Sequence, residues 1–168
     1  MKSRILRTAI ISGILILNIG CDQISKRMVR EHVSDFEQIS IIENYITLMR
    51  VENTGAFLSV GNSLPEPLRF ALLSLLPLII IGFGLGFLFT RSNISKYHAL
   101  GFAFVIGGGI GNIYDRLVHG SVTDFLHIDL GIFQTGVFNM ADVSIMTGVF
   151  IVLLNSLAQQ RAVNQPES

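Results

Sequence analysis

The stretch FALLSLLPLIIIGFGLGFLF, residues 70–89, contains no charged side chain and is long enough to cross a bilayer as a helix. A transmembrane helix needs about 20 predominantly apolar residues. Pro77 and the glycines at 82, 84 and 86 would weaken a helix in water, but in a bundle small residues allow helices to approach closely. The stretch therefore indicates a membrane protein, and its glycines predict contacts between helices.

Three further apolar stretches lie on either side of this one, at about residues 5–21, 99–118 and 137–157. The composition agrees, because 50% of the chain is hydrophobic and only 14% is charged, against roughly 25% in soluble domains. The sequence therefore predicts an all-α membrane fold, a four-helix transmembrane bundle that makes up a single polytopic domain over residues 1–168.

Basic residues near the ends of the spans predict the orientation, because Lys and Arg are enriched in cytoplasmic loops. On the side where the chain begins and ends they are Lys2, Arg4, Arg7, Arg91, Lys96 and Arg161. The first loop also carries basic residues, namely Lys26, Arg27, Arg30, Arg50 and Arg69, so the first span decides the orientation. We expect both termini in the cytoplasm and the loops at about 23–69 and 119–136 outside.

The first outward loop is long enough to form structure of its own. In QISIIENYITLMRV, residues 38–51, two β-rich runs at 39–42 and 45–51 flank Glu43-Asn44, which is typical of a hairpin. We expect a small β-element on the outer side of the membrane at about residues 38–60.

Several functions are unlike this composition. Lys plus Arg and Asp plus Glu number 12 each, so the chain has no basic footprint and we expect no nucleic-acid partner. The chain lacks HExxH, P-loop and GxSxG motifs, and its four histidines do not have the spacing of zinc ligands. The single cysteine, Cys21, is expected to be a buried apolar residue. We therefore expect neither a metal nor a cofactor.

The first residues have a second interpretation. A basic start, an apolar run and then Asn18-Ile-Gly-Cys21 resemble a lipoprotein signal peptide, which would make Cys21 a lipidated amino terminus. Asn18 stands where such a signal normally has an apolar residue, and three more spans follow. A retained first helix is therefore favoured.

Ionisable side chains at membrane depth are candidates for a functional site, because their burial is costly. Asp22 and Lys26 are four residues apart, so on a continued helix they share a face and can form an ion pair at the membrane border. Arg116, at the polar end of the third span, could extend to the interface or bind a carbonyl group. Gly107 and Gly111 in the same span predict tight helix packing.

Two aspartates flank the third loop at the outer border. Asp124 follows the third span, and Asp142 opens the fourth. Two carboxyl groups about 3 Å apart cannot both ionise, so one keeps a proton, and such a pair can activate water and protonate a leaving nitrogen. In the alternative reading, Asp142 only favours the start of a helix and Asp124 is a solvated loop acid. Asn139 suits either a helix N-cap or a hydrogen-bond donor to the pair.

Four ordered motifs then carry a resemblance that covers the whole chain. They are DQISK at 22–26, ENTGAF at 52–57, GGGIGNIYDRLVHGSVTDF at 107–125 and FNMAD at 138–142. Together they resemble the lipoprotein signal peptidase family, also called signal peptidase II. The resemblance implies a four-helix bundle of the bacterial inner membrane, with a β-cradle in the first loop and an active site at the periplasmic face.

The resemblance also implies the reaction and its residues. The substrate would be a prolipoprotein whose cysteine bears diacylglycerol, cut just before that cysteine by an aspartyl endopeptidase that uses Asp124 and Asp142 and works among membrane lipids. Matching positions in the substrate groove are Asn53, Gly55, Asn112, Arg116 and Asn139, and the supporting positions are Asp22 and Lys26. The sequence departs from the family pattern at Phe57-Leu58-Ser59, where many relatives have a second Ala before Phe. This difference affects the expected shape of the substrate groove and not the expected chemistry.

Two other classes of function remain to be weighed. A small transporter or channel would use the acids and Arg116 as a polar path, but the charges gather at one face and not at the midplane. A non-catalytic membrane scaffold would leave the paired acids without a purpose. Cleavage measured in reconstituted vesicles separates these classes.

Overall fold

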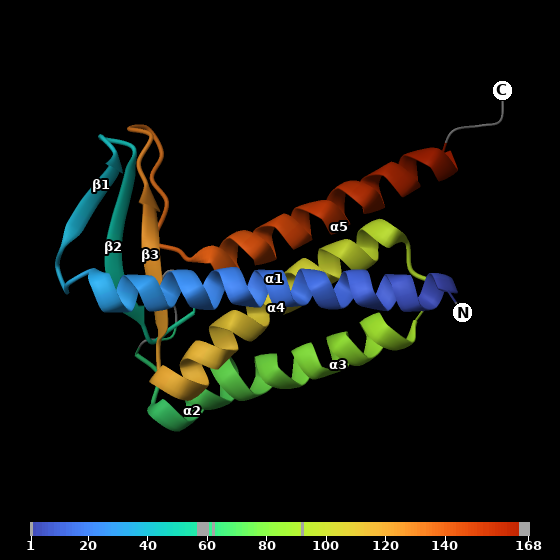
Figure 1. Cartoon of the computed structure of the whole chain (residues 1–168), viewed down its shortest axis with the longest axis horizontal. Coiled ribbons are helices and arrows are strands. Elements are labelled where there is room, and N and C mark those ends of the chain that lie inside the picture. The colour runs from blue at the N-terminus through green and yellow to red at the C-terminus, as the bar shows by residue number, and fades with distance from the viewer. Residues whose placement is uncertain (1, 57–60, 62, 92, 165–168) are drawn as a thin grey trace.

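The computed structural model describes residues 2–56, 61, 63–91 and 93–164. Long helices lie side by side, and a small sheet stands across one of their ends, with its strands running across the helix axes (Figure 1). The helical elements are α1 (Lys2–His32), α2 (Glu66–Phe70), the π-helical turn η2 (Ala71–Leu75), α3 (Leu76–Thr90), α4 (Lys96–His119) and α5 (Met140–Asn164).

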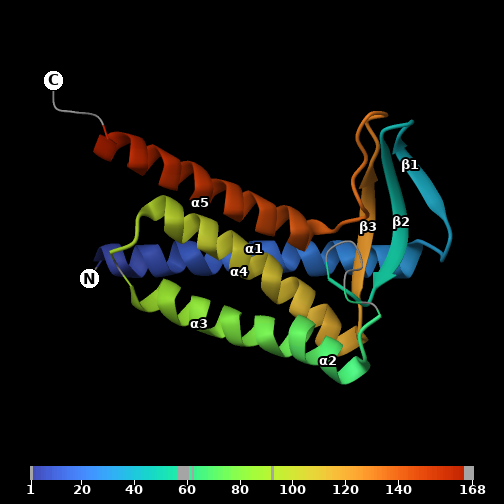
Figure 2. The ribbon, with the colours of Figure 1, turned by 180° about the vertical axis from the view of Figure 1, so that it is seen from behind.

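Three helical segments are long and apolar enough to cross a membrane: Arg4–His32, Glu66–Thr90 and Met140–Arg161. The expected third span, at about 99–118, is not among them, although α4 covers it. α4 lies at the centre and contacts α1, α3 and α5 (Figure 2). A central helix is surrounded by protein more than by lipid, so it can carry glycines and polar side chains that lower its hydropathy. That α4 crosses the membrane remains a prediction.

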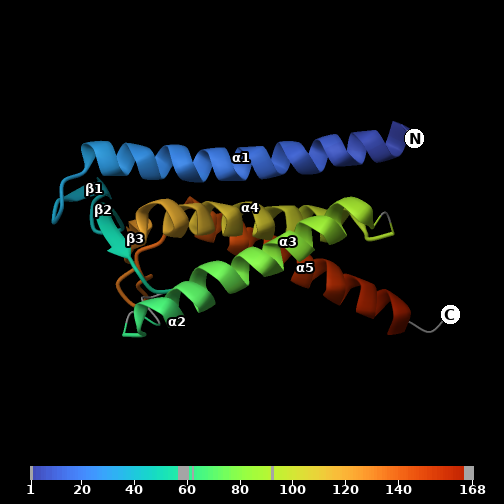
Figure 3. The same ribbon diagram turned by 90° about the horizontal axis from the view of Figure 1, so that it is seen from below.

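α1 is longer than the apolar run that predicted it, because it continues past Cys21 to His32. Its polar extension contains Asp22 and Lys26, which contact α4. α1 lies along one side of the other helices (Figure 3), so its far face is uncovered. Cys21 of α1 is exposed, so the expectation that it is buried was wrong.

The second span is continuous through α2, η2 and α3 despite Pro77. The N–H of Leu76 donates to the carbonyl of Ala71, five residues earlier, which widens the turn before the proline. Proline lacks an N–H and crowds the carbonyl four residues before it, which accounts for this wider turn. Of the three glycines predicted to contact another helix, Gly84 does so, because it faces Ile106 of α4. Gly82 and Gly86 have open space beside them, so the prediction was wrong there.

Glycines on α4 let two other helices approach its backbone closely. A methyl group at Gly108 would overlap the carbonyl of Ala141 in α5, and one at Gly111 would overlap the carboxylate of Asp22 in α1. Gly107 meets Asn18 of α1 in the same way, so the small-residue face predicted at 107 and 111 is confirmed. This close packing brings the start of α5 and the middle of α1 to the same part of α4.

The sheet contains three antiparallel strands in the order β1 (Gln38–Ile42), β2 (Ile46–Asn53) and β3 (Val122–Ile128). The predicted hairpin is confirmed, with Asn44 in the left-handed region at φ 62°. Residues 57–60, the end of the predicted β-element, lie outside the described residues.

The β-element expected in the first loop is present as β1 and β2, and a strand from the third loop extends it. β3 comes from the third loop and pairs with β2. Its first four residues are all buried, so the strand lacks the alternation of apolar and polar residues that identifies a half-exposed strand.

The fourth span begins at Met140, and not at Val137 as expected. Phe138 instead pairs with β3: its N–H donates to the carbonyl of Leu126, and its carbonyl accepts from the N–H groups of Phe125 and Leu126. This short bridge holds the start of α5 against the strand that carries Asp124.

Candidate active site

Asp124 and Asp142 are joined through Asn139. Asp124 lies on β3 opposite Val51 and is 4% exposed, and Asp142 lies in the first turn of α5. The side-chain amide of Asn139 donates to Asp124 Oδ1 at 2.6 Å, while its backbone N–H donates to Asp142 Oδ2 at 3.1 Å. The N–H of Asp142 donates back to Asn139 Oδ1 at 3.0 Å, which completes a reciprocal helix cap. Both roles left open for Asn139, cap and donor, are therefore present.

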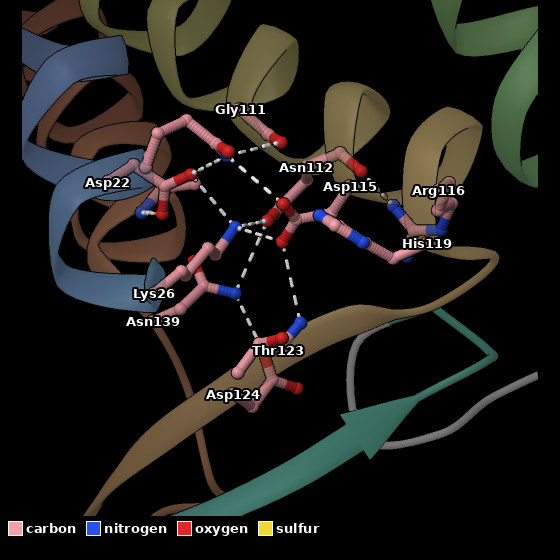
Figure 4. A network of polar contacts seen from close by, with 12 residues as sticks. Asp22, Lys26, Gly111, Asn112, Asp115, Arg116, His119, Thr123, Asp124 and Asn139 are labelled. Atoms are coloured by element: carbon pink, nitrogen blue, oxygen red, sulfur yellow. Dashed lines mark hydrogen bonds and ion pairs between the residues drawn. The ribbon is translucent and has the colours of Figure 1, made fainter. Parts of the chain in front are cut away.

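Asn112 of α4 provides a second link to this pair. Its Nδ2 donates to Asp142 Oδ1 at 3.0 Å, and its Oδ1 accepts from Lys26 Nζ at 2.8 Å and from Asn139 Nδ2 at 3.2 Å. Because two donors face Oδ1 of Asn112, the Nδ2 end of the same side chain must face the carboxylate of Asp142. Figure 4 shows Lys26 between Asn112 and two acidic side chains.

The end of β2 folds over the other side of Asp124. Asn53 Nδ2 donates to Asp124 Oδ2 at 3.0 Å, and Asn53 Oδ1 accepts from the N–H of Gly55 at 3.0 Å. Arg116 Nη2 donates to the carbonyl of Gly55 at 2.7 Å, so of the two sequence expectations for Arg116 the carbonyl contact is the one formed. Within the described ranges, the buried Nε of Arg116 has no hydrogen-bond partner.

Asp22 and Lys26 form the predicted ion pair, with 2.8 Å between Nζ and Oδ2. The pair is part of a larger cluster, because Lys26 also lies 3.0 Å from Asp115, and all three side chains are fully buried. Asp22 Oδ1 accepts from the N–H of Ala141 at 2.9 Å. The cluster therefore ties α1 to α4 and to the first turn of α5.

Two polar residues at the site were not selected from the sequence, although each lies in a quoted motif. Gln23 donates to Asp22 and to Asp115. Glu52 accepts from Ser121 Oγ at 2.6 Å and from Thr123 Oγ1 at 3.0 Å, which fixes the start of β3 against β2. Burial raises the pKa of Glu52, but these hydrogen bonds and Arg50 outweigh it and hold the pKa below its usual value.

Burial raises the pKa of Asp124 to about 6, and the nearby carboxylate of Asp142 adds to the rise. Hydrogen bonds from Asn53 and Asn139 act in the opposite direction. Asp124 is buried in β3, so the alternative that it is a solvated loop acid was wrong. A carboxyl group that titrates near neutrality can hold and release a proton under physiological conditions.

A cavity of about 40 Å³ opens beside the two carboxyl groups, which is room for one or two water molecules. It is lined by Asn53, Ala56, Asn112, Arg116, Val122, Asp124, Val137, Asn139 and Asp142. Among the described residues no group of three or more His, Cys, Asp or Glu side chains is arranged to hold a metal ion. The site therefore offers two carboxyl groups, three amides and a guanidinium around a small polar cavity.

The sequence model of the family described as signal peptidase (SPase) II matches residues 14–158. The chain belongs to the signal peptidase II family. Membership makes it an aspartic peptidase.

Individual relatives agree with this assignment. A lipoprotein signal peptidase of Streptococcus pneumoniae (strain ATCC BAA-255 / R6) is 32% identical over 95% of this chain and 97% of its own length. One from Aquifex aeolicus (strain VF5) is 30% identical over 91% of this chain and 86% of its own length.

Solved structures share the fold of this family member. A bacterial membrane enzyme determined at 2.3 Å superposes with a TM-score of 0.78 at 19% identity, covering 100% of this chain and 94% of the other. A second, determined at 1.9 Å, gives a TM-score of 0.74 at 20% identity and covers 94% of each chain. Together with the three apolar helical segments, these structures identify a multi-pass membrane protein.

Proposed function

We propose that this peptidase removes signal peptides from diacylglyceryl-modified prolipoproteins, cutting just before the lipidated cysteine, with Asp124 and Asp142 as the catalytic pair. The observation that carries the proposal is that Asn139 hydrogen-bonds both carboxyl groups beside one cavity. The relatives named lipoprotein signal peptidase support the substrate class.

The two carboxyl groups take different roles. Asp142 accepts from the N–H of Asn139 and from Asn112 at the start of α5, which holds its carboxyl group beside the cavity, and we assign it the role of general base. Asp124 is buried, which raises its pKa to about 6, and we assign it the proton in the form of the pair that starts the reaction. Asp142 takes a proton from water as the water oxygen attacks the scissile carbonyl carbon, and Asp124 gives its proton to the substrate. When the C–N bond breaks, Asp142 gives the proton that it took from water to the leaving nitrogen, and a hydroxyl of the tetrahedral intermediate returns a proton to Asp124 as the new carboxyl group forms. Both carboxyl groups are then in their starting states.

The remaining polar residues position the substrate. Arg116 already donates to two backbone carbonyls, those of Gly55 and Asn112, and its Nε is a further donor for a substrate carbonyl. Asn53, Asn112 and Asn139 keep the carboxyl groups in place and are suited to bind the extended segment around the scissile bond.

We place the site at the periplasmic face of the bacterial inner membrane. The start of α1 and the end of α5 lie at the helix ends opposite the sheet (Figure 1), and the basic residues in the first turns of α1 favour the cytoplasm for that side. α4 has 24 residues, about 36 Å of helix, which exceeds the roughly 30 Å of hydrocarbon, so it serves as the fourth transmembrane helix. The sheet would then form a cradle at the outer surface, where a substrate held by its acyl chains presents its amide.

The test uses the full chain in vesicles with a diacylglyceryl-modified prolipoprotein and a chelator. Asp124→Asn and Asp142→Asn should each lower cleavage by roughly 10² to 10⁴-fold or more, and the double variant should be little worse because the pair acts as a unit. Asp35→Asn is the matched control, since that side chain is 72% exposed and lies outside the site. Cleavage that persists in either catalytic variant, or that the chelator abolishes, contradicts the mechanism.

A further inference from the structure

Two grooves of different chemistry border the proposed catalytic pair. One, of about 160 Å³, is lined by Glu66, Arg69 and Arg116 among others. The other, of about 310 Å³, is lined by Asp142, Phe138, Val143 and Met146 together with Thr135, Gly136 and Thr147. The first groove shares Arg116 with the catalytic cavity and the second shares Asp142. One flank of the site is therefore ionic and the other is apolar.

The apolar groove runs along the face of α5 that points away from the bundle. The opposite face of α5 packs on α4, where Gly148 abuts Gly101 and Ser144 donates to the carbonyl of Phe104. Val143 and Met146 are 39% and 66% exposed. Met146 follows Asp142 by one helical turn, about 6 Å along the axis, so the groove leads from the carboxylate toward the membrane interior.

We propose that this groove binds an acyl chain of the substrate's diacylglyceryl cysteine. The inference rests on the proposed function and names the part of the site that recognises the lipid. The lipid is attached to the residue directly after the scissile bond, so its chains must leave the site through a groove that touches the catalytic pair. The ionic groove would set hydrocarbon against Arg69 and Arg116, which desolvates charges without compensation. The apolar groove has no such cost.

The groove positions the acyl chain through its shape and not through a gain of hydrophobic free energy. An acyl chain passes from membrane hydrocarbon into an apolar groove, so little hydrophobic free energy is gained. Its walls instead fix where the chain, and hence the scissile amide, lies relative to Asp142. Obstruction of the groove should therefore weaken productive binding of the lipid-modified substrate.

The first experiment maps the lipid directly. A prolipoprotein whose acyl chains carry a diazirine is irradiated with the Asp124→Asn protein in vesicles, and cross-linked residues are identified by mass spectrometry. We expect cross-links at Val143, Met146 and Thr147 that an excess of unlabelled lipid-modified substrate removes. A photoreactive phospholipid is the control for general lipid contact. Cross-links centred on the outward face of α3, or a pattern identical to that of the phospholipid, overturn the inference.

The second experiment narrows the groove. Met146→Trp should raise KM for the lipid-modified substrate by about tenfold, the scale of a misfit in an apolar pocket, with kcat little changed. Phe150→Trp is the matched control, because Phe150 is 60% exposed one turn further along α5 and does not line the groove. Equal KM values for the two variants refute the inference. Absence of cleavage by the unaltered protein would instead refute the proposed function.

Discussion

Replacement of Lys26 by methionine tests whether the buried ion cluster acts on the catalytic pair. The ammonium lies 2.8 Å from Asp22, 3.0 Å from Asp115 and 2.8 Å from Asn112 Oδ1. Lys26→Met keeps the length of the apolar stem and removes the charge. Two fully buried carboxylates would then retain one cation, Arg30, which lies 3.0 Å from Asp115.

The stability change follows from this burial. Removal of one partner from a buried ion pair costs about 3 to 5 kcal/mol. In a chain of this size each kcal/mol shifts the melting temperature by about 2 to 4 °C. Lys26→Met should therefore lower the melting temperature in detergent by on the order of 10 °C. A shift within the error of the measurement would contradict the cluster's stabilising role.

A second variant separates stability from catalysis. Lys26→Met combined with Asp22→Asn removes one positive and one negative charge, and the new amide can still accept from Ala141. Most of the stability should return. Cleavage should stay about 100-fold low, because Asn112 Oδ1 has lost the nearer of its two donors, which turn the other end of the amide toward Asp142. Recovery of cleavage together with stability would refute the positioning role and leave Lys26 a structural residue.

Three further predictions concern charge and topology. The raised pKa of Asp124 favours its protonated form in the folded protein, so that contribution to stability is complete below pH 4 and is lost as the pH rises through about 6. At pH 8 the free energy of unfolding of Asp124→Asn should therefore exceed that of the unaltered protein by about 1 to 3 kcal/mol. An equal difference at pH 4 would contradict this. Arg116→Lys should accumulate normally but lose cleavage, because one ammonium cannot hold the Gly55 carbonyl and a substrate together; full activity argues against the assignment. Reporter fusions should place Leu130 outside and Ser168 inside, and either reversed result rejects the topology.

The sequence predicted which residues make up the candidate site more fully than it predicted their contacts. Asp124, Asp142 and the five expected groove residues do lie together, since four of the five line the cavity and the fifth, Gly55, is bound by Arg116. The motifs could not show that Asn139 bonds both carboxyl groups, or that Lys26 reaches Asn112, because these contacts join α1, β3, α4 and α5. Gln23 and Glu52 were missed for the same reason, as their partners are distant in the sequence.

The sequence by itself determined the apolar helical segments, the hairpin and the candidate acids. A bilayer acts on each segment through its length and hydropathy, and a hairpin depends on neighbouring residues, so local patterns are sufficient for both. Only the tertiary structure decided that β3 completes the sheet, that α1 extends beyond its apolar run, and that α5 begins three residues late so that Phe138 can pair with β3. These features depend on buried partners far along the chain and on glycines that let α4 meet its neighbours, and such long-range contacts leave no periodic signal in the sequence.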